Sequence, residues 1–503
     1  MYKKTQIKST SKSHKKYILD DNSINKFKTI LINEEKKPQT IKKYMRDIIK
    51  LKEYAAGRPV NKELLITYKE HLKKDCGYKT TSINSFLAVI NTFVTEMGWN
   101  NLKIKMIKVQ KETFVPENKE ISINEYKALI NAAIKKGDER KAGYEHFMMK
   151  EIHEQPKAVK DTLNSVLKDG KLDLSAVELT NDEIKKISQI YIVACGSAYH
   201  AGVVAQYVIE DLAKIPVRVE LASEFRYRKP LLDPDGLVVV ISQSGETADS
   251  LAALRLAKDK GLKTLGIVNV VGSSKAREAD NVFYTLAGPE IAVATTKAYS
   301  TQLIAAYCLA LQFAYVRGEM ELSEYERLLS ELETIPEKIE KILEDKERLQ
   351  WFAAKVANSK DIFFIGRGID YAVSLEGSLK LKEISYIHSE AYAAGELKHG
   401  TISLIEDNIL VIGVLTQSEL YEKTVSNMVE CKSRGAYLCG LTTYGKYEVE
   451  DTVDFTTYIP KIDEHFSASL AVVPLQLLGY YVSVAKGLDV DKPRNLAKSV
   501  TVE

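Results

Sequence analysis

The feature that most constrains the fold is an alternation, from Ile190 onward, between short apolar runs and amphipathic segments of helical spacing. The apolar runs are rich in β-branched residues, which predicts buried strands. Strands that alternate with helices predict a parallel sheet covered by helices on both faces. The runs form two sets, so we expect an α/β fold with two doubly wound parallel sheets. They cover residues 190–195, 217–221, 237–242 and 264–269, then 362–365, 409–415, 437–441 and 455–459.

The two sets of strands form a weak internal repeat. In each set the first strand leads into a glycine, Gly196 or Gly368. In each set a later strand leads into a polar helix start, at residues 242–247 or 416–419. Only the first copy has a complete set of hydroxyl side chains, so we expect an anion to bind in the first sheet domain.

The segment from Ser242 to Thr247 reads Ser-Gln-Ser-Gly-Glu-Thr and precedes a helical pattern over 248–256. Unpaired N–H groups at a helix start, together with hydroxyl groups, favour an anion. The segment lacks lysine and the Gly-x-x-x-x-Gly-Lys pattern, which favours one small phosphomonoester over a nucleoside triphosphate. A capped turn without a ligand is the alternative interpretation.

Residues 22–94 contain four segments with apolar residues at helical spacing. Pro38 separates the first two, and Thr40 is a candidate N-cap of the second. Asn61 and Thr80 open the third and fourth. The short connections predict a small all-α bundle.

Charge is distributed unevenly along the chain. Residues 1–142 contain 31 Lys and Arg against 16 Asp and Glu, a balance of +15 within a net charge of +3, so the remainder carries −12. A basic segment of this kind is typical of proteins that bind nucleic acid. A lysine-rich composition without a ligand would give the same count. The polar, lysine-rich residues 1–16 are predicted to be disordered.

The cysteines and the hydropathy pattern indicate a compartment. The five cysteines are scattered and include no Cys-x-x-Cys pair, which argues against a disulfide framework or a zinc site. No apolar run is expected to reach the ~20 residues that span a bilayer, and no apolar segment follows the basic N-terminus. We therefore expect a cytoplasmic protein with reduced thiols and no membrane partner.

Three charged residues, Glu376, Lys380 and Glu383, share one face of a predicted helix. A mixed-charge face is usually solvated. The surrounding apolar positions, such as Leu379 and Ile384, indicate partial burial instead. Burial shifts the pKa values of carboxylates and amines toward values that suit proton transfer.

Two further segments are ambiguous from the residues alone. His399 follows Gly395 in a predicted loop, where it is either a surface residue or part of a site. Residues 491–503 have neither helical nor strand periodicity, and a frayed end is the default expectation for such a tail.

The N-terminal helices resemble a known DNA-binding domain. Residues 38–44, 79–84 and 86–93 are similar to the core-binding (SAM-like) domain of phage-type tyrosine recombinases. Residues 120–126 and 137–140 look like the opening of a recombinase catalytic domain, but no Arg…His-x-x-Arg…Tyr set follows. The resemblance implies DNA binding without strand transfer.

Residues 143–503 resemble the isomerase half of the glutamine–fructose-6-phosphate aminotransferase (glucosamine-6-phosphate synthase) family, which has two sugar isomerase (SIS) domains. The matching segments are 222–228, 242–249, 290–297, 379–388, 393–400 and the tail. The resemblance implies aldose–ketose chemistry on fructose 6-phosphate, with ammonia as a co-substrate, no cofactor and no metal.

The resemblance also implies roles for individual residues. The phosphate would be held by Ser242, Gln243, Ser244 and Thr247, and the sugar would contact Ser197, Val293, Thr295 and Ala497. His399 would open the sugar ring, across a homodimer interface, and Lys498 would form a Schiff base. Glu383 would carry a proton between C1 and C2, assisted by Lys380. Ala198 stands where many relatives have Ser, which removes one sugar contact.

The beginning of the chain departs from this family. The family's glutaminase nucleophile is a cysteine after the initiator Met, whereas Tyr2 stands here and nothing in 1–142 resembles that domain. We therefore expect ammonia-dependent synthesis or isomerisation alone. The predicted domain plan is a disordered tail (1–20), a SAM-like domain (21–110), a linker (111–142), a first SIS domain (143–320), a second SIS domain (321–486) and an active-site tail (487–503).

Three hypotheses remain open from the sequence. The first is an enzyme with a basic, DNA-binding appendage. The second is a DNA-tethered regulator that senses hexose phosphate. The third is a non-functional product of gene fusion.

Overall fold

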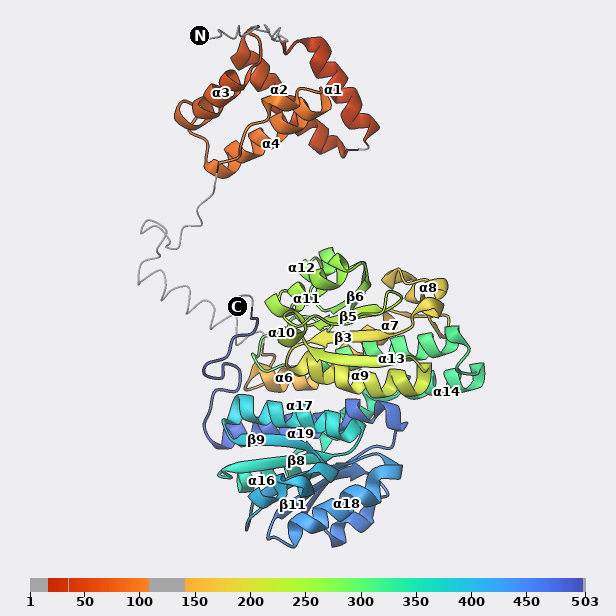
Figure 1. Cartoon of the computed structure of the whole chain (residues 1–503). Helices are drawn as coiled ribbons and strands as arrows, with labels where there is room; N and C mark the ends of the chain where they lie inside the picture. The colour runs from red at the N-terminus through yellow and green to blue at the C-terminus, as the bar shows by residue number, and fades with distance from the viewer. Residues whose placement is uncertain (1–16, 35, 108–140, 501–503) are drawn as a thin grey trace, which may run out of the picture. The chain divides into compact units, whose positions relative to one another are not determined.

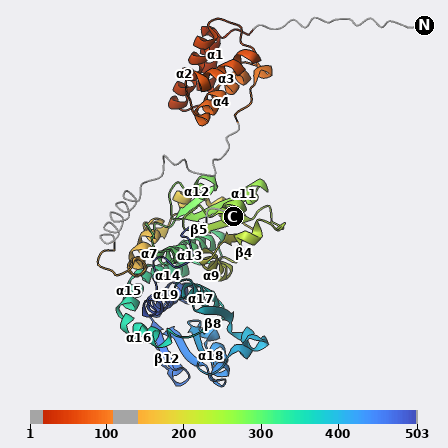
Figure 2. The same cartoon turned by 90° about the vertical axis from the view of Figure 1, so that its left-hand side faces the viewer.

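The computed structural model describes residues 17–34, 36–107 and 141–500. The chain divides into two compact units, Met1–Ala128 and Leu129–Glu503 (Figures 1 and 2). The predictions made for residues 1–16 and for 108–140 lie outside the described residues.

The N-terminal unit contains the four predicted helices, and two of their starts were predicted correctly. Asn61 caps the third helix by accepting a 2.8 Å hydrogen bond from the Leu64 N–H, and the fourth helix begins at Thr80. The predicted cap at Thr40 is wrong: the second helix begins at Pro38, whose fixed φ suits the first helical position. The elements are α1 (Asp21–Asn33), α2 (Pro38–Ala55), α3 (Lys62–Lys74), α4 (Thr80–Glu96) and the 3-10 turn η1 (Asn100–Leu102).

The N-terminal unit has a hydrophobic core of its own. Buried side chains from all four helices form one cluster. At its centre Phe27 packs edge-on against Phe93, with ring centroids 5.0 Å apart, and Phe93 packs against Trp99 at 5.4 Å. A separate core is what allows a segment to behave as a domain.

The second unit contains the two predicted parallel sheets. The first sheet has the order β4-β3-β5-β6-β7, with every neighbouring pair parallel. Four of its strands lie within one residue of the predicted bounds, whereas β7 was missed because only alternate residues of this short strand are buried. The strands are β3 (Ile190–Ala194), β4 (Val217–Leu221), β5 (Leu237–Ser242), β6 (Lys263–Val268) and β7 (Asn281–Tyr284).

Helices cover both faces of the first sheet. Its buried residues divide into two clusters, one shared with α9 and α13 and the other with α10 and α11. The helices of this domain are α6 (Phe147–His153), α7 (Gln155–Asn164), α8 (Asn181–Lys186), α9 (Ser197–Ala213), α10 (Ala222–Phe225), α11 (Ala248–Asp259), α12 (Ser274–Glu278) and α13 (Lys297–Arg317); a short hairpin, β1 (Leu167–Lys168) with β2 (Lys171–Leu172), and η3 (Leu174–Val177) also belong to it.

The second sheet repeats the first, in the order β12-β11-β10-β8-β9. Its edge strand β9 was missed because its sequence is largely polar. The strands are β8 (Asp361–Gly366), β9 (His388–Ala393), β10 (Leu410–Leu415), β11 (Tyr437–Thr443) and β12 (Phe455–Ile459). The helices and turns are α14 (Leu322–Glu333), α15 (Ile335–Glu344), α16 (Lys346–Val356), α17 (Ile369–Ser385), η4 (Ala394–His399), η5 (Thr401–Leu404), α18 (Ser418–Lys432), η6 (Tyr447–Asp451), η7 (Glu464–Phe466) and α19 (Ser467–Ala485).

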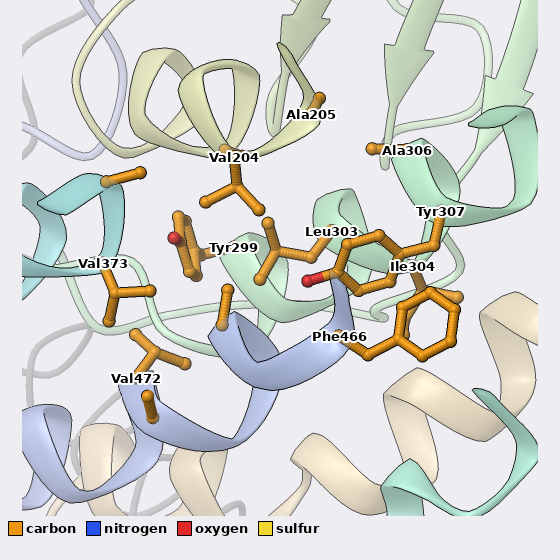
Figure 3. Close-up of a cluster of buried hydrophobic side chains, with 14 of the residues drawn as sticks. Val204, Ala205, Tyr299, Leu303, Ile304, Ala306, Tyr307, Val373, Phe466 and Val472 are labelled. Carbon is orange, nitrogen blue, oxygen red and sulfur yellow. The ribbon is translucent and has the colours of Figure 1, made fainter. Parts of the chain in front are cut away.

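The two sheet domains share a core made by helices that lie between the sheets. Figure 3 shows Tyr299 of α13 beside Val373 of α17 and Val472 of α19, and Tyr307 of α13 beside Phe466, which precedes α19. All five side chains are completely buried. Because one continuous cluster of buried residues runs through both domains, the two sheets are held as one body.

One segment, Glu464–Ala485, is long and apolar enough to cross a membrane, contrary to the expectation that no run reaches this length. Of its most apolar window, 89% is buried inside the protein. The apolar composition is therefore explained by the position of α19 in the shared core (Figure 1).

Candidate functional site

A cavity lies at the carboxyl end of the first sheet, where β3 and β5 are neighbours. The strands of this sheet are ordered 2-1-3-4-5 in chain sequence, so the chain turns in opposite directions after β3 and after β5. Such switch points are where open α/β sheets bind ligands. The cavity holds about 170 Å³, more than ten times what one ordered water needs. Its lining includes Ser197, Ser242, Gln243, Ser244, Thr247, Val293, Thr295, Glu383, Ala497 and Lys498.

The 242–247 loop turns its donors toward this cavity. Gly245 has φ of 69°, and a Cβ at this position would lie 2.0 Å from the Ser273 hydroxyl, so only glycine fits. The Gly245 N–H donates to Ser242 Oγ at 3.1 Å, and Ser242 Oγ lies 3.4 Å from Thr247 Oγ1. Thr247 is the N-cap residue of α11, but its side chain makes no capping bond. The arrangement is the one expected of a small anion site.

Lys275 is a residue of this region that the sequence did not reveal. It belongs to α12, and its side chain is completely buried behind the loop. Its Nζ donates to the Thr247 carbonyl at 2.9 Å and to Ser242 Oγ at 3.4 Å. Burial lowers the pKa of this ammonium to about 8. No local pattern identifies it, because only the tertiary fold brings it to the loop.

The charged face of α17 is buried rather than solvated. Glu376 and Lys380 are fully buried, and Lys380 Nζ lies 3.5 Å from Glu376 and 2.5 Å from Glu383. Burial alone would lower the pKa of Lys380, but the Glu383 and Glu376 carboxylates raise it above its usual value. Lys380 is therefore a fixed cation, and Glu383 reaches the cavity with 21% of its side chain exposed.

Glu376 connects this face to the first sheet domain. It accepts a 2.9 Å hydrogen bond from the Ser197 hydroxyl and lies 2.8 Å from His200 Nδ1. Burial acts to raise the pKa of Glu376, but the Lys380 charge and the His200 contact hold it below its usual value. His200 was not predicted as a site residue; it lies one turn after Ser197 on α9.

The C-terminal tail is docked along the first domain, and the default expectation of a frayed end is wrong for residues 491–500. The Val293 N–H donates to the Asp491 carbonyl at 3.0 Å, and the Ala248 N–H donates to the Val500 carbonyl at 3.1 Å. These contacts bring Lys498 to the cavity. In Figure 1 the dark blue tail leaves the second domain and runs to the first.

Lys498 meets a carboxylate at the cavity wall. Its Nζ donates to Glu290 Oε2 at 2.6 Å and to the Ala292 carbonyl at 2.8 Å. Glu290 is fully buried, and behind it Glu151 accepts hydrogen bonds from the N–H groups of Ile291 and Ala292. Burial and the neighbouring Glu290 carboxylate raise the pKa of Glu151 to about 8. An amine beside a carboxylate that can accept its proton is suited to nucleophilic chemistry.

His399 lies apart from these residues. It ends the 3-10 turn η4 and is exposed to solvent, outside the cavity lining. Its predicted action across a homodimer interface stays a prediction. Among the described residues, no group of three His, Cys, Asp or Glu side chains is arranged to hold a metal ion.

Comparison with known families identifies the two sheet domains. A family described as "SIS domain" matches residues 183–312 and 355–486. These ranges include all ten strands of the two parallel sheets. The chain belongs to the SIS domain family. Each SIS domain contains one parallel sheet, and the cavity lies in the first.

Several curated proteins of one name are similar to most of the chain. Glutamine–fructose-6-phosphate aminotransferase (isomerizing) of Clostridium tetani is 56% identical over 406 residues, which cover 80% of this chain and 66% of the relative. The protein of the same name from Caldanaerobacter subterraneus subsp. tengcongensis is 57% identical over 364 residues, 72% of this chain and 60% of the relative. The chain thus spans less than two thirds of the length of these relatives.

Solved structures give the same result. The C-terminal domain of glucosamine-fructose-6-phosphate aminotransferase from Francisella tularensis is 39% identical, with a TM-score of 0.68, over 70% of this chain and 99% of that one. Glucosamine-6-phosphate deaminase from Thermotoga maritima is 26% identical, with a TM-score of 0.54, and the match covers 70% of this chain and 99% of that one. The SIS pair of this chain is therefore similar to the isomerase half of the aminotransferases, and the recombinase resemblance stays a prediction.

Proposed function

We propose that the first SIS cavity converts fructose 6-phosphate into an aldose phosphate or, with ammonia, into glucosamine 6-phosphate. One observation carries the proposal: the 242–247 loop, Glu383 and Lys498 come from separate parts of the chain and line one cavity. The anion loop suits a phosphate, and a carboxylate with an amine suits the carbonyl end of a sugar. The printed names of the relatives support the same substrate.

In this proposal the loop holds the phosphate group. Ser242, Ser244 and Thr247 donate hydroxyl hydrogens, Gln243 donates its amide, and backbone N–H groups at the start of α11 add the helix dipole. Along the rest of the sugar lie Ser197, Val293, Thr295 and Ala497, which line the same cavity.

The chemical steps follow from the two reactive side chains. Glu290 takes a proton from Lys498, whose Nζ then attacks C2 of the open-chain ketose; a C–N bond forms and water leaves. Glu383 removes a proton from C1 and returns it to C2, with Lys380 keeping the carboxylate ionised between transfers. Isomerisation takes place on the free ketose, after the Lys498 imine has been hydrolysed back to the ketone. The same transfer from C1 to C2 then turns the C1 hydroxyl into the aldehyde, the C2 carbonyl oxygen takes up a proton, and the aldose is the product. If ammonia first displaces Lys498 at C2, the same proton transfer gives glucosamine 6-phosphate.

His399 is assigned ring opening from the partner subunit of a homodimer. Its exposed position outside the cavity supports this assignment, because a solvent-facing side chain can enter the site of a second copy. Replacement of His399 by Asn should slow turnover of the cyclic substrate. Mixing this variant with a Lys498→Ala variant should restore part of the activity if the histidine acts in trans.

The nitrogen source is tested by an assay with purified full-length protein. Fructose 6-phosphate is supplied alone, with ammonium or with glutamine, and glucose 6-phosphate and glucosamine 6-phosphate are measured. We expect isomerisation or ammonium-dependent synthesis and no glutamine-dependent product. Absence of any product, with correctly folded protein, would contradict the enzyme proposal.

The regulator hypothesis differs in what it requires of the cavity. A sensor needs the phosphate loop but not a proton carrier or an imine-forming amine. Glu383 and Lys498 both line the cavity, which favours the enzyme. A non-functional fusion product would show neither expression in the source cell nor turnover in the assay.

We also propose that the N-terminal unit binds DNA. Four basic side chains, Lys28, Lys42, Arg46 and Lys50, line a groove formed by α1 and α2. Cations on adjacent helices are suited to contact the phosphates of one duplex. Retention of a duplex in a gel-shift assay at low salt, lost as salt rises, is the expected result. No retention at low salt would exclude this role.

A further inference from the structure

Lys275 is a buried cation without an ionic partner. Its side chain is completely inaccessible to solvent, yet within the described part of the chain no carboxylate lies within ion-pair distance of its Nζ. Its two acceptors are neutral: the Thr247 carbonyl at 2.9 Å and Ser242 Oγ at 3.4 Å. Burying an unpaired charge is costly, so proteins that retain one generally use it.

The hydrogen bonds that Ser242 Oγ accepts determine the direction of the Ser242 hydroxyl hydrogen. Ser242 Oγ receives the Gly245 N–H at 3.1 Å and the Lys275 ammonium at 3.4 Å. A hydroxyl oxygen has two acceptor sites and one donor hydrogen. With both acceptor sites occupied, the hydrogen of Ser242 is directed toward the cavity side, where Thr247 Oγ1 lies at 3.4 Å. The ammonium thus makes Ser242 a fixed donor.

The charged and titratable groups around Lys275 are few. Glu246, in the loop, accepts from the Ser274 N–H at 2.7 Å, and Cys195, after β3, contacts Ser250 at 3.7 Å. On α11, Asp249 is paired with Arg226 at 2.9 Å. Burial lowers the pKa of Lys275 to about 8, and Cys195 and Glu246 oppose the shift weakly. The side chain is mostly an ammonium at pH 7 and mostly a neutral amine above pH 9.

We infer that Lys275 is a positioning residue for the substrate phosphate, acting through Ser242 and supplying the positive charge that the 242–247 loop lacks. The inference rests on the proposed function and extends it to the choice of ligand. A phosphomonoester dianion bound by Ser242 would lie one hydrogen-bonded group away from the Lys275 ammonium and would supply the negative charge that this cation lacks among the described residues. An unphosphorylated sugar brings no such charge, so we expect it to bind more weakly.

Binding of the dianion must favour the charged form of Lys275. Below pH 8 the cation is already present, and above pH 8 a proton has to be taken up with the ligand. Affinity should therefore fall up to about tenfold for each pH unit above 8. A phosphomonoester is a dianion throughout this range, because its second pKa is about 6.

The test measures binding of fructose 6-phosphate to the full-length protein by calorimetry at pH 7.5 and 9.5. Wild type should bind at pH 7.5 and lose roughly tenfold or more at pH 9.5. The Lys275→Met variant should bind roughly tenfold more weakly at pH 7.5 and show a smaller pH dependence. Its KM should rise with kcat nearly unchanged. Lys260→Met, at an exposed lysine after α11, is the control and should match wild type.

Thermal unfolding without ligand distinguishes the proposed positioning role of Lys275 from a role in stability alone. Removing a buried unpaired charge should leave the melting temperature of Lys275→Met equal to or above that of wild type. If the variant is instead poorly folded, proton uptake by wild type on binding at pH 8.5, measured in two buffers of different ionisation enthalpy, provides the test. No uptake would overturn the inference.

The outcomes distinguish this inference from the proposed function. If wild type binds and Lys275→Met has the same affinity and pH profile, the role of Lys275 is wrong and the proposed function stands. If wild type binds no fructose 6-phosphate at either pH, both are overturned.

Discussion

The two SIS domains have the same strand order but use the donors at their switch points differently. Gly196 and Gly368 open α9 and α17 with nearly identical backbone angles, φ and ψ of 56° and −133° against 57° and −128°. In the first domain the donors of the 242–247 loop line a cavity. In the second domain the corresponding donors are occupied: the N–H groups of Thr416 and Gln417 donate to Asp370, at 2.8 and 3.2 Å.

A second carboxylate completes this internal pairing. The Ser418 N–H donates to Glu464 at 2.9 Å, so the start of α18 also has an acidic partner from within the chain. The difference teaches that a duplicated fold can lose a ligand site by supplying the ligand's charge itself. Under the proposed function, the first domain takes its anion from outside the chain.

The largest expected effect comes from the amine of the first site. Lys498→Ala should reduce turnover by roughly 10³-fold, because the imine cannot form. Lys492→Ala, an exposed lysine of the same tail, should retain activity. Steady-state rates of glucosamine 6-phosphate formation from fructose 6-phosphate and ammonium give the comparison. Comparable rates for the two variants would show that the reaction does not depend on Lys498 or on the cavity of the first domain.

The next effect concerns the shape of the loop. Gly245→Ala places a methyl group 2.0 Å from the Ser273 hydroxyl in a backbone region that favours glycine, so KM should rise about tenfold or more as the loop shifts. Gly261→Ala has a similar φ of 79° and open space around its Cβ. It should cost about 1 kcal/mol of stability and leave KM unchanged.

A substitution of Asp370, at the switch point of the second sheet, should change the stability of the protein rather than its catalysis. Asp370 is buried, and burial raises the pKa of its carboxyl to about 6 against the opposing effect of the bonds from Thr416. Asp370→Asn replaces one acceptor oxygen by a donor and should lower the free energy of unfolding by about 2 kcal/mol. Denaturant unfolding measures this. A matching loss in kcat would show that the second domain takes part in the reaction.

The smallest effect, counted per pH unit, is the pH dependence of stability set by Glu151 in the first domain. Its folded pKa, about 8, lies above its ordinary value of 4.5, so the folded state binds the extra proton between these values. Stability should fall as pH rises through this window, by up to about 1.4 kcal/mol per unit, and level off above it. Glu151→Gln should flatten that part of the profile, and an unchanged profile would assign the dependence to another group.

The sequence predicted the buried strands because such strands carry their own signal. β5 was placed correctly at both ends, since a continuous run of apolar residues identifies a strand buried on two faces. The edge strands β7 and β9 have no such run, and their pairing depends on neighbours already in place. The local pattern alone could not identify them.

In the candidate site, too, only the features with a local cause in the sequence could be predicted. The 242–247 loop has a local cause, a strand that ends at a helix start, and its position was predictable. The contacts of Lys275, His200 and Glu290 depend on packing between distant segments, and no spacing rule in the sequence describes such packing. The flanking apolar residues predicted partial burial of the face that carries Glu376, but its contacts were not predictable, because Ser197 and His200 come from α9.

The docked tail has a consequence for the order in which the site can assemble. Lys498 lies 256 residues after Ser242 and 115 residues after Glu383 along the chain. The backbone bonds of Asp491 and Val500 that hold the tail need a first sheet domain that is already folded. Local opening of the tail would therefore withdraw the amine while both sheets and the shared core stay intact, so the reactive group can be lost and regained without global unfolding.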